Sequence, residues 1–294
     1  MNRKPPFPPS LRGRKAAAIP RTGRLLPPSK ARGRDDKQLR DVQSEPDIRR
    51  IPIDKVGVKD IRYPVKVLDR KNRFQHTVAS VNMYVDLPHH FKGTHMSRFI
   101  EVLNEYRGEI TIRNFRSILE KMKKKFNANS AHLEVEFPYF IEKPAPVSRA
   151  KGLMEYRVKL SGALAKKMDF ILEVSVPVLT LCPCSKEISK KGAHNQRGMV
   201  KVGARFKGFV WIEDIIKAIE KSASSPVYSL LKRADEKFVT EKAYDNPMFV
   251  EDVVRETSLN LKKIRGIIWA RIEVENMESI HNHSAYAYLE RNFR

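Results

Sequence analysis

The sequence predicts an α+β fold with antiparallel sheets. The main observation is the order of its segments, because extended runs, helical runs and further extended runs follow one another twice along the chain. The composition is globular, since 41% of the 294 residues are hydrophobic and 31% are charged. A chain of this length buries roughly three quarters of its unfolded surface, so a real core is expected.

The first half opens with two extended segments rich in Val, Tyr and Thr, at 60–70 and 73–87. In the second segment Val81, Met83 and Val85 recur at every other position, which is typical of a strand with one buried face. Apolar residues at helical spacing then predict a helix near 96–106. The next expected elements are a helix at about 113–127 and extended runs near 131–142, 153–165 and 169–181.

The second half repeats this order without close sequence identity to the first. A strand near 197–210 leads to a helix with isoleucines on one side, and strands near 267–276 and 283–290 end the chain. Pro247, a good first-turn residue, predicts the start of a long helix. The isoleucines are Ile212, Ile215, Ile216 and Ile219, and the inward-facing residues expected on the long helix are Phe249, Val250, Val253 and Val254.

The charge is concentrated near the N-terminus. The chain has 57 Lys+Arg and 34 Asp+Glu, a net charge of +23. Residues 1–44 carry twelve of these cations, three Asp and seven of the 18 prolines, so this segment holds +9 and the body +14. We interpret residues 1–44 as a disordered basic tail. It could contact nucleic acid or maintain solubility, and a mitochondrial transit peptide is a third hypothesis for this segment.

Several classes of protein are disfavoured by what the sequence lacks. It has no apolar run long enough for a membrane span and no secretory signal. Two cysteines are too few for a disulfide scaffold, so we expect reduced thiols and a cytoplasmic location. The phosphate loop GxxxxGK[ST], the dinucleotide motif GxGxxG, the GxSxG elbow and the HExxH helix are all absent.

Two thiols and an imidazole lie within 13 residues after a predicted strand. Cys182, Cys184 and His194 could supply metal ligands, and a catalytic metal site needs only about three protein ligands. The spacing is not that of a zinc finger. The alternative is that the cysteines are small buried side chains and His194 is an ordinary loop residue.

Two further clusters contain histidines. His281 and His283 are two apart, so on a strand they face the same side and could act as general acid and base. The alternative is a surface turn with solvated histidines. Residues 89–98 precede the first helix, with Thr94 as a plausible N-cap and a basic first turn that could receive an anion. The alternative is an ordinary capped helix. By themselves Glu236 and Glu251 are typical of a solvated helix face.

Five segments together resemble the prokaryotic type IB GTP cyclohydrolase I family. They are LPHHFKGTHMSR (87–98), TLCPCSKEIS (180–189), GAHNQRG (192–198), DNPMFVED (245–252) and SIHNHSAY (279–286), and the resemblance covers about residues 42–294. It implies a tunnelling fold of two ββααββ modules per chain, at about 45–165 and 166–294. These modules would assemble into barrels in a homotetramer with active sites at subunit interfaces.

The implied reaction converts GTP and water to 7,8-dihydroneopterin triphosphate and formate, the first step towards folate. The resemblance makes Cys182, His194 and Glu236 metal ligands, whose metal-bound water attacks C8 of guanine. Cys184 would relay a proton or contact substrate, and His281 and His283 would be the acid/base pair. The resemblance also makes Glu251 the anchor for guanine, because one carboxylate can accept from N1–H and the 2-amino group. Candidate triphosphate contacts are Lys92, His95, Arg98, Lys186, Lys190 and Arg197.

The expected cofactor is a divalent metal, zinc or manganese, with iron possible. The expected partners are GTP and further copies of the chain, without a membrane and with nucleic acid at most on the tail. The nearest enzymatic rival is the NADPH-dependent nitrile reductase of queuosine synthesis, which shares the tunnelling fold and uses a cysteine nucleophile. The rival from another class is a basic nucleic-acid-binding protein, for which salt-dependent association without turnover is expected.

Overall fold

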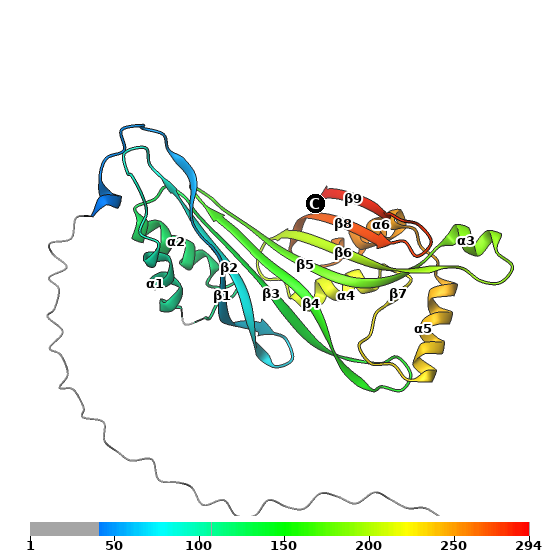
Figure 1. The fold of residues 1–294 in the computed structure, drawn as a ribbon. Coiled ribbons are helices and arrows are strands. Elements are labelled where there is room, and N and C mark those ends of the chain that lie inside the picture. The colour runs from blue at the N-terminus through cyan, green and yellow to red at the C-terminus, as the bar shows by residue number, and fades with distance from the viewer. Residues whose placement is uncertain (1–40, 107, 294) are drawn as a thin grey trace, which may run out of the picture. The chain divides into compact units, whose positions relative to one another are not determined.

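The computed structural model describes residues 41–106 and 108–293, and the chain from residue 41 onward forms one compact unit (Figure 1). Most of the basic tail, residues 1–40, lies outside the described residues. The tail's last residues are described, and Val42–Ser44 form a short 3-10 helix, η2. The Asp41 carboxylate caps it by accepting from the backbone N–H of Ser44. None of the described helices is long and apolar enough to cross a membrane.

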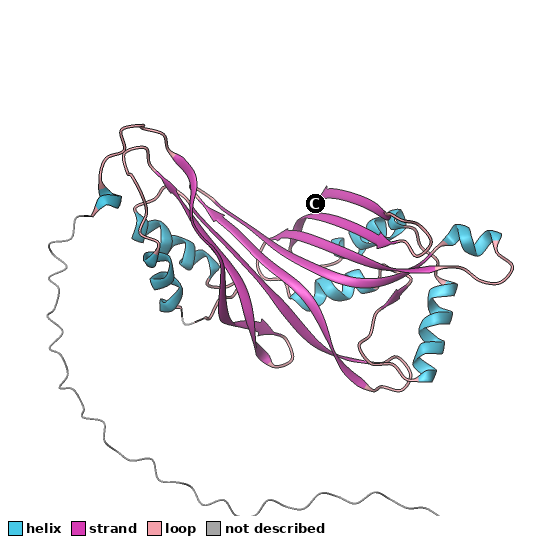
Figure 2. Ribbon diagram, viewed as in Figure 1, coloured by secondary structure: helices cyan, strands magenta, loops and turns pink. Residues whose placement is uncertain are grey.

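The strands of the described chain form one sheet in which every pair of neighbours is antiparallel. Its order is β1-β2-β3-β4-β5-β6-β8-β9, and the short β7 pairs with β5 (Figure 2). Strands of both halves therefore belong to the same sheet. The strands are β1 (Ile53–Asp69), β2 (Arg73–Leu87), β3 (Ala131–Pro144), β4 (Lys151–Leu164), β5 (Met168–Leu181), β6 (Asn195–Phe206), β7 (Ser225–Pro226), β8 (Ile267–Met277) and β9 (Ser284–Asn292).

The helices lie between pairs of strands. Two connect β2 to β3 and three connect β6 to β8, while a short one follows β5 (Figure 1). They are α1 (Ser97–Glu105), α2 (Phe115–Phe126), α3 (Pro183–Ile188), α4 (Ile212–Glu220), α5 (Arg233–Asp245) and α6 (Val250–Lys262). The predicted α+β class and antiparallel order are confirmed.

One face of the sheet forms the core. Register partners on four successive strands are fully buried valines and an isoleucine, and burying each contributes about 1.5–3 kcal/mol. Helices α1, α2, α4 and α6 add buried side chains to this core, and α2 packs so closely that a Cβ on Gly162 would lie 2.5 Å from the Phe115 ring. The four partners are Val158, Val174, Val202 and Ile272.

The start of the last helix differs from the prediction. Pro247 is not its first residue, because α6 begins at Val250 with Phe249 as N-cap. The Asp252 carboxylate accepts from the Phe249 N–H at 3.1 Å, and this capping interaction sets the first turn. Phe249 was expected to face inward and is instead 41% exposed, while Val250, Val253 and Val254 are buried as predicted.

Candidate active site

The connection from β5 to β6 brings Cys182 and His194 together. Leu181 and Asn195 form the last backbone pair of these strands, and the Cys182 N–H donates to the His194 carbonyl one step further, at 3.1 Å. Cys182 also caps α3, since its Sγ accepts from the Ser185 N–H at 3.4 Å. The Ser185 hydroxyl in turn accepts from the His194 N–H at 3.2 Å. Backbone and cap therefore hold the two predicted ligands side by side.

The thiols differ in exposure. Cys182 is half-buried at the start of α3, whereas Cys184 is exposed within its first turn. Both are free cysteines, as the sequence predicted. The alternative that both are small buried side chains is therefore wrong, because α3 projects beyond the sheet and turns Cys184 to solvent (Figure 1).

The histidine pair lies in an exposed loop, as in the surface-turn alternative, and β9 starts one residue after the predicted position 283. Met277 and Ser284 form the last backbone pair of β8 and β9, which leaves residues 278–283 outside the ladder. The rings of His281 and His283 still stack, with centroids 5.1 Å apart and planes 22° from parallel. Both side chains are exposed. The loop therefore offers two neighbouring imidazoles.

The same loop contacts the first cluster. The Ser279 hydroxyl lies 3.2 Å from His194 Nδ1, and the Gln196 amide donates to the Glu278 carboxylate at 3.1 Å. Residues from β5, β6 and the β8–β9 loop therefore meet at one end of the sheet. The sequence did not predict a role for Gln196, Glu278 or Ser279, although all three lie in or beside the family motifs.

The two predicted carboxylates come from different helices. Glu251 is exposed in the first turn of α6, and the Met248 N–H donates to the Leu181 carbonyl at 3.0 Å, so α6 starts beside the end of β5. Glu236 is exposed near the start of α5, whose far end contacts α3 where Lys186 donates to the Tyr244 carbonyl at 2.5 Å. Glu236 lies eight helical steps before Tyr244, or about 12 Å along the axis.

Asp235, next to Glu236, has a structural role. Its carboxylate is fully buried and accepts from the Val147 N–H, from the N–H and hydroxyl of Ser148, and from the Lys232 N–H, at 2.6–2.8 Å. Burial alone would raise the pKa of Asp235, but these hydrogen bonds favour the charged form and hold its pKa well below the usual range. Asp235 therefore fastens α5 to the β3–β4 loop.

The predicted metal ligands form only part of a site in the single chain. Thiol, imidazole and carboxylate are donor types that suit a divalent transition metal. Among the residues that the structure describes, however, no three His, Cys, Asp or Glu side chains gather closely enough to hold an ion. Cys182 and His194 are brought together, and Glu236 is not.

The predicted phosphate contacts are divided between the two ends of the sheet. Lys186 lies in α3, Lys190 follows it and Arg197 lies near the start of β6, all in the segment that carries Cys182 and His194. Lys92 and His95 precede α1, at the end of the sheet opposite to α3 (Figure 1). Their side chains pair with Glu45 at 3.6 Å and Asp41 at 3.2 Å, and the half-buried Arg98 follows in α1. The prediction that Thr94 caps this helix is wrong. The helix starts at Ser97, and carbonyls of residues 95 and 96 accept from its first N–H groups.

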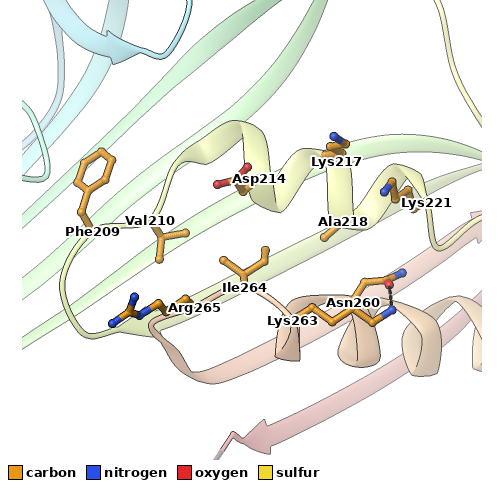
Figure 3. Close-up of a pocket in the computed structure, with 10 residues that line it drawn as sticks. All are labelled: Phe209, Val210, Asp214, Lys217, Ala218, Lys221, Asn260, Lys263, Ile264 and Arg265. Carbon is orange, nitrogen blue, oxygen red and sulfur yellow. Dashed lines mark hydrogen bonds between the residues drawn. The ribbon is translucent and has the colours of Figure 1, made fainter.

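A hollow of about 440 Å³ between α4 and the end of α6 contains none of the predicted site residues (Figure 3). It is basic, but Lys221 and Lys263 are the C-caps of α4 and α6. Positive charge is favourable at such helix ends, so this charge has a structural explanation. Its lining is Phe209, Val210, Asp214, Lys217, Ala218, Lys221, Asn260, Lys263, Ile264 and Arg265.

Solved structures resemble the fold. The chain superimposes on uricase from Arthrobacter globiformis with a TM-score of 0.52 and 8% identity, covering 82% of this chain and 93% of that one. A uricase from Bacillus fastidious gives 0.51 and 7%, covering 81% and 92%. At this identity the likeness concerns the fold alone. Uricases have the tunnelling fold, so the expected fold is confirmed for the single chain.

Sequence relatives are much closer. A family model described as type I GTP cyclohydrolase folE2 matches residues 39–287. GTP cyclohydrolase FolE2 of Syntrophotalea carbinolica is 64% identical over 252 residues, 86% of this chain and 95% of that protein. GTP cyclohydrolase FolE2 of Geobacter sulfurreducens is 62% identical over 254 residues, 86% and 98% of the two chains. The chain therefore belongs to the type I GTP cyclohydrolase FolE2 family.

Proposed function

We propose that this chain is a metal-dependent GTP cyclohydrolase of the prokaryotic type IB, which converts GTP and water to 7,8-dihydroneopterin triphosphate and formate at the start of folate synthesis. The observation that carries the proposal is the 64% identity to a GTP cyclohydrolase FolE2 over 86% of the chain. The contact between Cys182, His194 and the loop 278–283, here called the histidine loop, at one end of the sheet supports it.

Cys182 and His194 would hold the divalent metal, with Glu236 as third ligand. Thiolate and imidazole suit zinc, while a carboxylate also suits manganese or iron. When bound, such a metal lowers the pKa of a coordinated water to about 7. The exposed Glu236 would complete the ligand set in the assembled enzyme.

The remaining residues would bind guanine and move protons. Glu251 would accept from N1–H and the 2-amino group, and a different base would leave this carboxylate unpaired. The stacked rings of His281 and His283 are close enough to serve neighbouring atoms of one substrate as acid and base. Cys184, exposed next to Cys182, would relay a proton or contact the substrate.

The triphosphate would be held by Lys92, His95 and Arg98. The other candidates, Lys186, Lys190 and Arg197, lie at the α3 end of the same chain. Since Lys92, His95 and Arg98 precede or begin α1, at the opposite end of the sheet, one chain does not offer both halves of this site to one GTP (Figure 1). A second copy can supply the missing half. The strands β1 and β9 are the outer strands of the described sheet, so each has an edge for pairing with another copy. We therefore propose a homotetramer of closed barrels with active sites between subunits.

The test is to strip the metal, add GTP, and follow formate and fluorescent neopterin as Zn²⁺ or Mn²⁺ is returned. We expect turnover to depend on the metal and to be lost in Cys182→Ala. Turnover after complete chelation would contradict the proposal. A parallel assay with 7-cyano-7-deazaguanine and NADPH separates the nitrile reductase, because only that enzyme oxidises NADPH.

A further inference from the structure

Strand β6 and the histidine loop remain in register beyond the end of their backbone ladder. The last backbone pair of β6 and β8 is Arg197 with Met277. One step further, the Gln196 amide donates to the Glu278 carboxylate at 3.1 Å. This side-chain bond replaces the next rung of the ladder, at the first residue of the loop 278–283.

Gln196 is held in a buried polar environment. It is only 6% exposed, and its register partner on β5, Thr180, is fully buried on the same face. The Gln196 Oε1 and the Thr180 Oγ1 have no hydrogen-bond partner among the described residues. Buried polar groups of this kind on an apolar sheet face call for a specific role.

We propose that Gln196 is a positioning residue, which through Glu278 fixes the loop carrying His281 and His283 relative to the strand that begins beside His194. The exposed loop has few other attachments in the described chain, and the Ser279 contact to His194 at 3.2 Å depends on the same placement. The catalytic part of this inference rests on the proposed function, because the acid/base roles belong to it. The placement of the loop by Gln196 does not rest on the proposed function.

The placement is tested first, without substrate. Gln196→Met keeps the side chain's size and removes the amide donor. Gln75→Met is the matched control, because the Gln75 amide also donates to a carboxylate, Asp69 at 3.0 Å, but far from the loop. Millisecond hydrogen exchange followed by mass spectrometry should show residues 278–283 exchanging at least about threefold faster in Gln196→Met only. Unchanged exchange in this loop would overturn the inference.

The consequence for catalysis is tested with an exchange of partners. Gln196→Glu places two carboxylates against each other, and the double variant Gln196→Glu with Glu278→Gln restores an amide-to-carboxylate bond in the opposite direction. We expect Gln196→Met and Gln196→Glu to lower kcat by about tenfold or more, with KM for GTP changed by less than about threefold. The double variant should recover both kcat and slow loop exchange.

Each remaining outcome has one meaning. Failure of the double variant to recover would overturn the route through Glu278. A loosened loop with unchanged kcat would overturn the positioning role. Absence of GTP turnover in the unaltered, metal-loaded protein would instead contradict the proposed function, while the exchange measurements would still decide the placement.

Discussion

The two halves of the sheet share one plan and differ in their connections. In the first half, β1 and β2 are joined by the short turn 70–72, in which Asp69 accepts from the backbone N–H groups of Lys71 and Asn72 at 2.8 and 2.6 Å. In the second half, β5 and β6 are joined by residues 182–194, which contain α3 and both predicted ligands Cys182 and His194. The first connection only closes a hairpin, whereas the second holds groups capable of chemistry.

The same contrast extends to the other connections. Between β2 and β3 the chain forms only α1 and α2, while between β6 and β8 it adds α5, which bears Glu236. Both α2 and α6 bury an apolar stripe, but α5 buries only Asp235 and Ala243. The apolar elements therefore build the fold in both halves, and the polar additions in the second half carry the proposed site.

The largest expected effect separates the two hairpin connections. Cys182→Ala should lower kcat/KM for GTP by about a thousandfold or more with loss of bound metal, because it removes a proposed ligand. Asp69→Asn should lower Tm by several degrees, about 2–4 °C per kcal/mol for a chain of this size, and keep kcat. Metal content by mass spectrometry, steady-state kinetics and thermal melts check this. Full activity in Cys182→Ala would contradict the proposal that the β5–β6 connection carries catalytic groups while the β1–β2 turn is only structural.

The next expected effect distinguishes adjacent residues of α5. Glu236→Gln should lower kcat/KM by about a hundredfold at unchanged Tm, since Glu236 is exposed and is proposed to bind metal. Asp235→Asn should lower Tm instead, because the hydrogen bonds to Val147 and Ser148 lose their charged acceptor. A loss of activity in Asp235→Asn larger than that in Glu236→Gln would reverse the assignment.

The contribution of Asp235 to the stability of the folded chain should depend on pH. Its pKa in the folded chain lies below the ordinary value of 3.8, so its stabilising contribution is fully present well above pH 4. As the pH falls below about 4, the unfolded chain takes up the proton first and the contribution is progressively lost. The difference in stability between the unaltered chain and Asp235→Asn should therefore be constant near neutral pH and shrink below pH about 4. Urea unfolding across this range measures it.

The sequence predicted the regular elements because their apolar residues have a clear period. It did not predict α5, which lacks an apolar stripe, nor the start of α6, which the Asp252 cap determines. The spacing of His281 and His283 agrees with a strand as well as with a loop. Only the pairing of Met277 with Ser284 decides between them.

Parts of the candidate site depend on register and assembly, which spacing does not encode. Cys182 and His194 are neighbours because Leu181 pairs with Asn195 across the hairpin. The family motifs indicated both residues but not this contact. The separation of Lys92 from α3 could not be read from the sequence, because it follows from the length of the sheet (Figure 1).

A further prediction concerns the separation of Arg98 from Cys182. If each site combines these residues from two copies, Arg98→Ala and Cys182→Ala chains should each be inactive as pure assemblies but regain activity when coexpressed. Random assembly leaves about a quarter of the interfaces with both intact residues, so about a quarter of the unaltered kcat is expected. Assemblies isolated with two different affinity tags provide the measurement. Background activity only in the mixture would place both residues in one subunit's site.

The smallest expected effect concerns the N-terminal boundary. Removing residues 1–40 should leave kcat and KM within about twofold, since the compact unit begins at residue 41. Removing residues 1–45 also deletes Gln43, whose amide donates to the Thr94 carbonyl at 3.1 Å, and the Asp41 carboxylate that pairs with His95. The loop before α1 then loses its attachments, so KM for GTP should rise several-fold at nearly constant kcat. Because both truncations remove the same twelve Lys and Arg residues, a rise in KM already present on removal of 1–40 would assign the effect to the charge of the tail.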